Sequence, residues 1–121
     1  MKGMVISKSA VMRKILRGVL YSVDLSEVAL MSSGTEGFEA IKADKFDIVL
    51  LDSYLSDIGI SDFIRELRVH GNRIVIFVFG VESNRDFVLE TIHAGATGFI
   101  IRPFKRPVVS NRIRQALLDL N

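Results

Sequence analysis

The chain has 121 residues, no cysteine and a formal net charge of +2 at pH 7. This length suits one domain with one core, so we expect a single domain over residues 1–121. The lack of cysteine excludes disulfides and thiolate metal sites, and the 49% apolar content argues against disorder. The first apolar run is broken at residues 7–9, too early for a signal peptide, and no run reaches the roughly 20 apolar residues that cross a bilayer. We therefore expect a cytoplasmic protein without membrane contact.

The first part of the chain alternates short apolar runs with segments of helical period. Residues 4–6 predict a strand, and Ser9 then predicts the N-cap of a helix with apolar residues at spacings of three and four. Residues 28–31 predict a second strand, followed by a second helix. Residues 46–51 predict a third strand, which is apolar enough to be covered on both faces.

The second part continues the same alternation. After a third helix, residues 74–79 form the most hydrophobic run, and their β-branched and aromatic residues predict a central strand. Ser83 predicts the cap of a fourth helix that ends at Gly95. Residues 98–101 predict the last strand, and Pro107 fits the first turn of the last helix. Five strand–helix units in succession predict an α/β fold with a parallel sheet and helices on both faces.

Basic residues are concentrated in two segments. Such clusters can meet an acidic partner or nucleic acid, but solvated helix faces explain them better, because no aromatic is interleaved and no nucleic-acid motif is present. We therefore do not expect this domain alone to bind nucleic acid. The residues are Arg13, Lys14 and Arg17 in the first segment, and Arg102, Lys105, Arg106, Arg112 and Arg114 in the second.

The carboxyl ends of the predicted strands are where a ligand site is expected, since open α/β sheets bind ligands at that edge. The candidates are the residues that follow or end these strands, which include Phe79 and Val81 around Gly80, and Pro103 after Arg102. The main positions of the predicted site are Ser7, Lys8, Asp52, Gly80 and Arg102.

Three segments resemble the response-regulator receiver domain family of two-component signalling, in its chemotaxis type. Residues 9–16 are similar to the opening of the family's first helix. Residues 46–52 followed by 63–68 resemble its third strand, phosphoacceptor aspartate and third helix. Residues 95–104 resemble its final strand with a basic residue, proline and phenylalanine at the end. The resemblance implies a flavodoxin-like sheet in the order 2-1-3-4-5 with five helices, and it makes Asp52 the phosphoacceptor position.

The magnesium positions depart from this family. It places two acidic residues after the first strand, which hold Mg²⁺ together with the phosphoacceptor, whereas this chain has Ser7 and Lys8 there. An ammonium repels the metal, so we expect Mg²⁺ binding to be lost or weak, with no metal or other cofactor. We hypothesise that Lys8 is a built-in cation opposite Asp52; the alternative is a solvated loop lysine.

Three further positions of the family compare as follows. The family's Ser or Thr after the fourth strand falls on Gly80 when counted from Gly95 without gaps, or on Phe79 after a shift of one residue, and neither has a hydroxyl. The family's lysine after the fifth strand is replaced by Arg102, which keeps the charge but not the compact ammonium. The aromatic switch position is retained as Phe99.

These departures lead us to expect a phosphorylation-impaired receiver that acts as a protein–protein interaction module and not as an enzyme. The resemblance implies partners such as a histidine kinase, an output domain or another receiver, and a possible homodimer through the fourth helix, fifth strand and fifth helix. One alternative is a functional response regulator that accepts a phosphoryl group on Asp52. A more distant alternative is a small flavodoxin-like enzyme or cofactor-binding protein.

Overall fold

The computed structural model of the protein describes residues 1–55, 57–69, 73–81 and 84–120. Within these ranges no helix has the length and apolarity needed to span a bilayer. Strands and helices alternate along the whole chain. In order they are β1 Lys2–Ile6, α1 Ala10–Tyr21, β2 Glu27–Met31, α2 Gly34–Ala43, β3 Ile48–Asp52, α3 Ile60–Val69, β4 Val75–Gly80, α4 Arg85–Ala94, β5 Gly98–Ile101 and α5 Arg106–Leu118.

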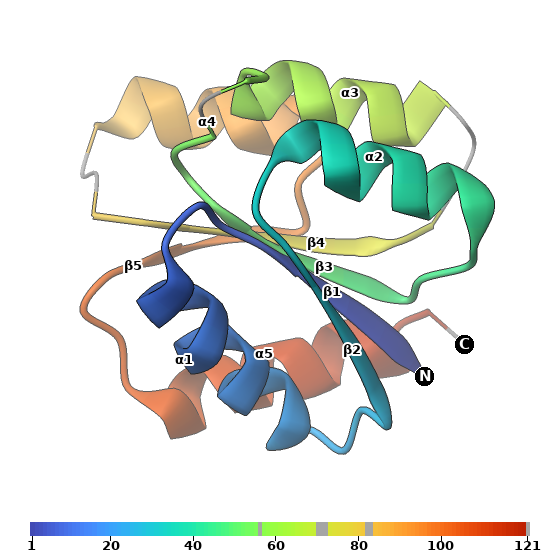
Figure 1. Ribbon diagram of the computed structural model, residues 1–121. Helices are drawn as coiled ribbons and strands as arrows, with labels where there is room; N and C mark the ends of the chain where they lie inside the picture. Colours follow the sequence, from blue (N-terminus) through green and yellow to red (C-terminus); the bar gives the residue numbers. More distant parts are fainter. Residues whose placement is uncertain (56, 70–72, 82–83, 121) are drawn as a thin grey trace.

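The five strands form one parallel sheet in the order β2-β1-β3-β4-β5. Figure 1 shows α1 and α5 on one face of the sheet and α2, α3 and α4 on the other. The predicted flavodoxin-like α/β fold is confirmed, together with its strand order and its five helices. Strands β3 and β4 are buried along their whole length, as their unbroken apolar sequences require.

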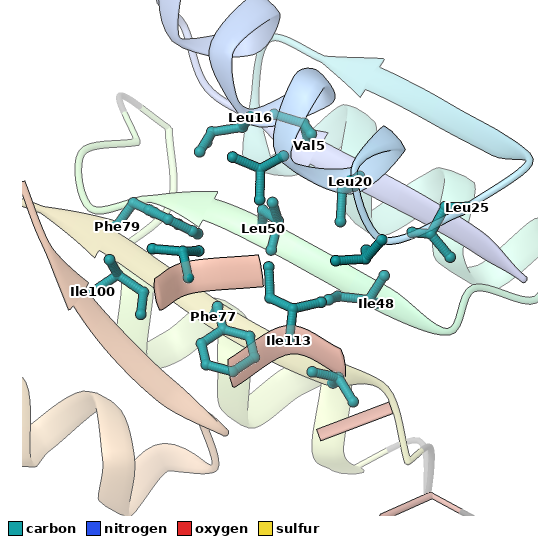
Figure 2. Packing of buried hydrophobic residues seen from close by; sticks show 14 of the residues in the cluster. Val5, Leu16, Leu20, Leu25, Ile48, Leu50, Phe77, Phe79, Ile100 and Ile113 are labelled. Carbon is teal, nitrogen blue, oxygen red and sulfur yellow. The ribbon is translucent and has the colours of Figure 1, made fainter. Parts of the chain in front are cut away.

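Two apolar layers flank the sheet, because successive side chains of a strand point to opposite faces. Leu50 belongs to the layer under α1 and α5, while its neighbours Val49 and Leu51 belong to the layer under α2, α3 and α4. Figure 2 shows the first of these layers from close by. Its labelled members are Val5, Leu16, Leu20, Leu25, Ile48, Leu50, Phe77, Phe79, Ile100 and Ile113.

The helix ends follow most of the predicted signals. Ser9 caps α1, and its hydroxyl accepts a hydrogen bond from the amide of Met12 at 3.2 Å. Gly95 ends α4 with a φ of 122°, a backbone conformation that favours glycine. The predicted cap Ser83 lies outside the described residues; next to it, Asn84 caps α4 by accepting from two amides of the first turn.

Two long-range contacts fix helices on the α2, α3 and α4 side. The guanidinium of Arg68 in α3 donates twice to the carbonyl of Gly95, at 3.0 and 2.9 Å, and so holds the end of α4. Burial lowers the pKa of Arg68 from its ordinary value. Asp57, in the loop after β3, accepts from the amides of Gly34 and Thr35 at 3.1 and 2.9 Å. That loop is therefore fastened to the start of α2.

Candidate functional site

Asp52 is the last residue of β3 and lies at the carboxyl edge of the sheet, where it is only 6% exposed. Ser7, which follows β1 and is fully buried, donates from its hydroxyl to Asp52 Oδ2 at 2.8 Å. The amide of Tyr54 donates weakly to Asp52 Oδ1 at 3.4 Å. The order of the strands brings these groups together, since β1 and β4 are the two neighbours of β3.

Arg102 supplies the cation of this site. Its Nη2 lies 3.6 Å from Asp52 Oδ1, which makes an ion pair without an aligned hydrogen bond. Its Nε is buried without a hydrogen-bond partner in the described part of the chain. The amide of Arg102 donates to the carbonyl of Gly80 at 2.7 Å, so the pairing of β5 with β4 continues to the residue that carries the guanidinium. The carboxylate of Asp52 at the end of β3 is thus balanced by Arg102, which follows β5, two strands away in the sheet.

Lys8 makes a different contact from the one that we hypothesised, which was an ion pair with Asp52. In the described part of the chain, the structure gives Asp52 an ion pair with Arg102 and none with Lys8. The ammonium of Lys8 lies over the ring of Tyr54, 4.3 Å from its centroid, on the exposed rim of the site. The physical reason is the turn between β1 and α1: the Ser9 amide bonds the Ser7 hydroxyl at 3.1 Å, and Lys8, between them, is exposed.

Gly80, the last residue of β4, lies at the site with no room for a side chain. A Cβ there would stand 2.8 Å from Ser53 Oγ and 2.9 Å from Phe99 Cζ, closer than real Cβ contacts. The alternative position, Phe79, is fully buried in the α1 and α5 layer, where its ring meets Phe104 edge-on at 5.3 Å. The residue at the site is therefore Gly80.

The structure also places a hydroxyl at the site that the sequence reasoning missed. Ser53 follows Asp52 directly, and its Oγ occupies the space beside Gly80. The sequence does contain a serine directly after the aspartate. Only the pairing of β3 with β4 shows that this Ser53 lies beside Gly80.

Phe99 lies inside the molecule beside Gly80. It is 9% exposed, and its ring packs edge-on against Phe87 of α4 at 5.9 Å. The same ring reaches Gly80, so Phe99 links the carboxyl edge of the sheet to α4.

The sequence as a whole places the chain among known proteins. The family model described as the response regulator receiver domain matches residues 4–114. The chain belongs to the response regulator receiver domain family. It is therefore a receiver domain of two-component signalling, and the match includes Ser7, Asp52, Gly80 and Arg102.

Individual relatives of this receiver domain are distant in sequence and close in fold. It is 22% identical over 123 residues to the chemotaxis protein CheY of Pseudomonas aeruginosa, covering 100% of this chain and 99% of that protein. It is 28% identical over 102 residues to the chemotaxis protein CheY of Thermotoga maritima, covering 84% and 85% of the two chains. A two-component response regulator from Clostridium difficile matches in structure with a TM-score of 0.90 at 18% identity, covering 99% and 98% of the chains. The likeness in structure supports the fold, and the chemistry has to be argued from the side chains.

The side chains at this edge of the receiver domain do not fit Mg²⁺, the metal that the family implies. Mg²⁺ needs several hard oxygen ligands and is usually held by carboxylates with waters and phosphate. Asp52 is the carboxylate of the site, and it already carries the hydroxyl of Ser7 and the guanidinium of Arg102. Among the described residues, no three carboxylate, histidine or cysteine side chains are grouped so as to hold a metal ion.

Proposed function

We propose that this receiver domain is phosphorylation-impaired and acts as a protein–protein interaction module in two-component signalling. The observation that carries the proposal is that the Asp52 carboxylate is balanced by Arg102 and Ser7 from within the fold. On this proposal the domain has no catalytic activity of its own. It acts in the cytoplasm, and its partner is a histidine kinase, an output domain or another receiver.

The argument against phosphorylation is electrostatic. Phosphoryl transfer depends on positioned cations, chiefly a metal, that neutralise charge building up on the transferred group. Ser7 offers a hydroxyl where a carboxylate would hold that metal, and its hydrogen bond to Asp52 is already in place. Gly80 offers no hydroxyl to a phosphoryl group. Each loss weakens a different part of the reaction, so the losses compound.

The argument for an interaction module rests on the face formed by α4, β5 and α5. Leu89, Ile92 and Ile101 expose apolar surface there, at 41%, 38% and 51%. Phe99 lies buried beneath this face. Its ring packs directly against Gly80, which has no side chain to displace it. Because packing within the fold fixes the shape of this face, a partner or a second copy in a homodimer can bind it without phosphorylation.

One observation favours a second candidate, a receiver that still accepts a phosphoryl group. Asp52 ends β3 at the edge of the sheet, and Arg102 brings a positive charge to it. A guanidinium can stabilise phosphoryl oxygens, so a slow, metal-independent reaction is the form that this candidate takes.

Acetyl phosphate with about 10 mM MgCl₂ decides between the two candidates, because it needs no partner protein. After acid quenching, the intact mass of the parent should stay unchanged. Ser7→Asp/Lys8→Asp restores two carboxylates and should gain the mass of one phosphoryl group, which Asp52→Asn in the same background removes. A parent that gains this mass, and loses the gain on Asp52→Asn, would overturn the proposal in favour of the second candidate.

A further inference from the structure

A pocket of about 1110 Å³ opens at the amino edge of the sheet, opposite the edge that carries Asp52. Figure 1 shows the starts of β3 and β4 and the C-terminal ends of α2 and α3 on this same side of the molecule. The volume is close to the upper end of the range for pockets that hold small organic ligands. The floor of this amino-edge pocket is apolar and is formed by Phe38, Ile41, Phe46, Leu67, Ile74 and Leu120.

Packing within the fold holds this floor in place. Phe46, Leu67 and Ile74 are at most 5% exposed and belong to the apolar layer under α2, α3 and α4. The ring of Phe38 packs edge-on against Phe63 at 6.3 Å. A floor that is already ordered lowers the cost of binding, because few side chains lose freedom when a ligand arrives.

The acidic side chains at the mouth of the pocket are engaged within the fold. Asp44 forms an ion pair with Lys2. Asp47 accepts a hydrogen bond from the amide of Lys2 at 2.7 Å. Lys42, a cation at the same mouth, lies 3.0 Å from the carboxylate of Glu39. These contacts leave the remaining basic side chains as the groups that can meet a ligand.

Lys45 and Arg73 are those basic side chains. Both are exposed and line the pocket, and within the described residues neither forms an ion pair. Arg73 donates from Nη2 to the carbonyl of Leu120 at 3.2 Å, which holds its guanidinium at the mouth. The carbonyl ends of α2 and α3 also reach this edge, but their partial negative charge acts only within the last turn, whereas Lys45 and Arg73 carry full charges.

We propose that the amino-edge pocket binds a small organic anion with a large apolar body. The apolar floor covers the body, and Lys45 and Arg73 pair with the anionic group. A neutral apolar ligand would leave both cations without a partner, and a small inorganic anion would leave the floor uncovered. This inference goes beyond the proposed function, because the pocket lies at the other end of β3, roughly 16 Å from Asp52 at about 3.3 Å per residue.

Two fluorescent probes that differ by one group test this directly. They are anilinonaphthalene sulfonate and phenylnaphthylamine, which has the same rings without the sulfonate. The sulfonate should bind the parent with a Kd on the order of 10–100 µM, at least about threefold more tightly than the neutral probe. Raising NaCl from about 50 to about 300 mM should reduce this preference, because salt screens exposed charges.

Three variants separate the parts of the pocket. Lys45→Glu/Arg73→Glu should weaken the sulfonate at least about tenfold and leave the neutral probe within about twofold of the parent. Ile41→Asn, which makes the floor polar, should weaken both probes at least about threefold. Lys14→Glu/Arg85→Glu makes the same change in net charge at exposed positions outside the pocket, and it should bind both probes like the parent.

Amide NMR of the labelled parent with the sulfonate locates the site, and shifts are expected at the ends of α2 and α3 and at the starts of β3 and β4. Shifts confined to other elements, equal affinity for the two probes, or binding kept by Lys45→Glu/Arg73→Glu would overturn the proposal. Shifts at the pocket that grow with protein concentration and without a probe would overturn it in favour of a second copy. If that double variant fails to fold, Lys45→Gln/Arg73→Gln replaces it, with a loss of at least about threefold expected. All these proteins keep Asp52, so the result is independent of the acetyl phosphate experiment.

Discussion

At the scale of single residues, the negative charge of Asp52 is compensated by side chains at the ends of two other strands. Asp52 is buried, and an isolated buried carboxylate is costly because protein interiors solvate charge poorly. Ser7 and Arg102 share the compensation, the first through a hydrogen bond of 2.8 Å and the second through an ion pair of 3.6 Å. The ion pair is long and not aligned as a hydrogen bond. Arg102 therefore stabilises Asp52 by the attraction between opposite charges.

Removal of that cation should therefore cost stability only while Asp52 is present. We expect Arg102→Met to lower the free energy of unfolding by about 2 kcal/mol at neutral pH, because it leaves a buried charge without its partner. Adding Asp52→Asn should recover more than half of this loss, and urea unfolding of the two single variants and the double variant measures the coupling. Arg85→Met, at an exposed position of α4, is the control and should change stability by less than about 0.5 kcal/mol. Additive losses would mean that the ion pair contributes nothing.

Gly80 gives a second prediction at this scale. Gly80→Ser introduces a Cβ that collides with Ser53 and Phe99, so Phe99 should leave its buried position. We expect a loss of about 1–3 kcal/mol and the disappearance of the NMR contacts between the rings of Phe99 and Phe87. Gly59→Ser is the matched control, because the nearest atom to its Cβ lies at an ordinary 3.6 Å. Retention of the ring contacts in Gly80→Ser would show that Phe99 is not held by this glycine.

At the scale of elements, the loop after β3 is built into the fold through Asp57. This carboxylate accepts from the Thr35 hydroxyl at 2.5 Å as well as from the two amides at the start of α2. It thus supplements the cap that Ser33 provides within the helix. The segment beside Asp52 is anchored at its far end to a neighbouring helix.

This anchor should make stability depend on pH in acid. The hydrogen bonds from the Thr35 hydroxyl and then the Thr35 amide lower the pKa of Asp57 below its ordinary value of 3.8. A lowered pKa in the folded state means that the contribution is fully present above the ordinary value and is lost as pH falls through the folded value. Asp57→Ala should therefore cost about 1 kcal/mol near pH 6, and parent and variant should converge at the acid end of a urea-unfolding series. Thr35→Val, which keeps the backbone donors, should show a smaller loss of the same sign.

The elements were predictable from the sequence, and the contacts between them were not. The alternation of apolar runs with helical segments sufficed to predict a parallel sheet with two covered faces, and the resemblance to receiver domains supplied the strand order. Asp52 and Arg102 were placed at the same edge by strand order. The position of Lys8 over Tyr54 was not predictable, since an exposed lysine chooses among contacts worth about 1 kcal/mol or less. The fit of Phe99 over Gly80 depends on tenths of an ångström between strand ends, which no sequence pattern encodes.

At the scale of the whole molecule, the concentration of cations in and around α1 and α5 has a cost in stability. Residues 7–23 and 102–118 hold nine Lys and Arg residues and no Asp or Glu, and of these nine Arg102 is paired with Asp52. Folding brings the two segments together on one side of the sheet, so the other cations repel one another. Dissolved ions screen such repulsion over about 10 Å at 0.1 M salt.

Salt should therefore stabilise this domain. Raising NaCl from about 20 to about 300 mM should increase the free energy of unfolding by on the order of 0.5–1 kcal/mol. Lys14→Glu/Arg106→Glu should remove most of this increase, whereas Lys45→Glu/Arg85→Glu should leave it. Urea unfolding at several salt concentrations gives all three values. An equal salt response in all three proteins would show that the repulsion is spread over the surface and is not confined to this face.

On the proposed function, the ion pair between Asp52 and Arg102 makes the concentration of this protein the quantity that controls its partner. A receiver that switches between two charge states carries a signal in the fraction of its copies that is modified. A domain whose carboxylate is permanently balanced has no such fraction. The occupancy of its partner then follows the ratio of its free concentration to Kd, and a tenfold rise centred on Kd takes occupancy from about one quarter to about three quarters. The rates of synthesis and degradation of the protein then set the signal, because they set its concentration.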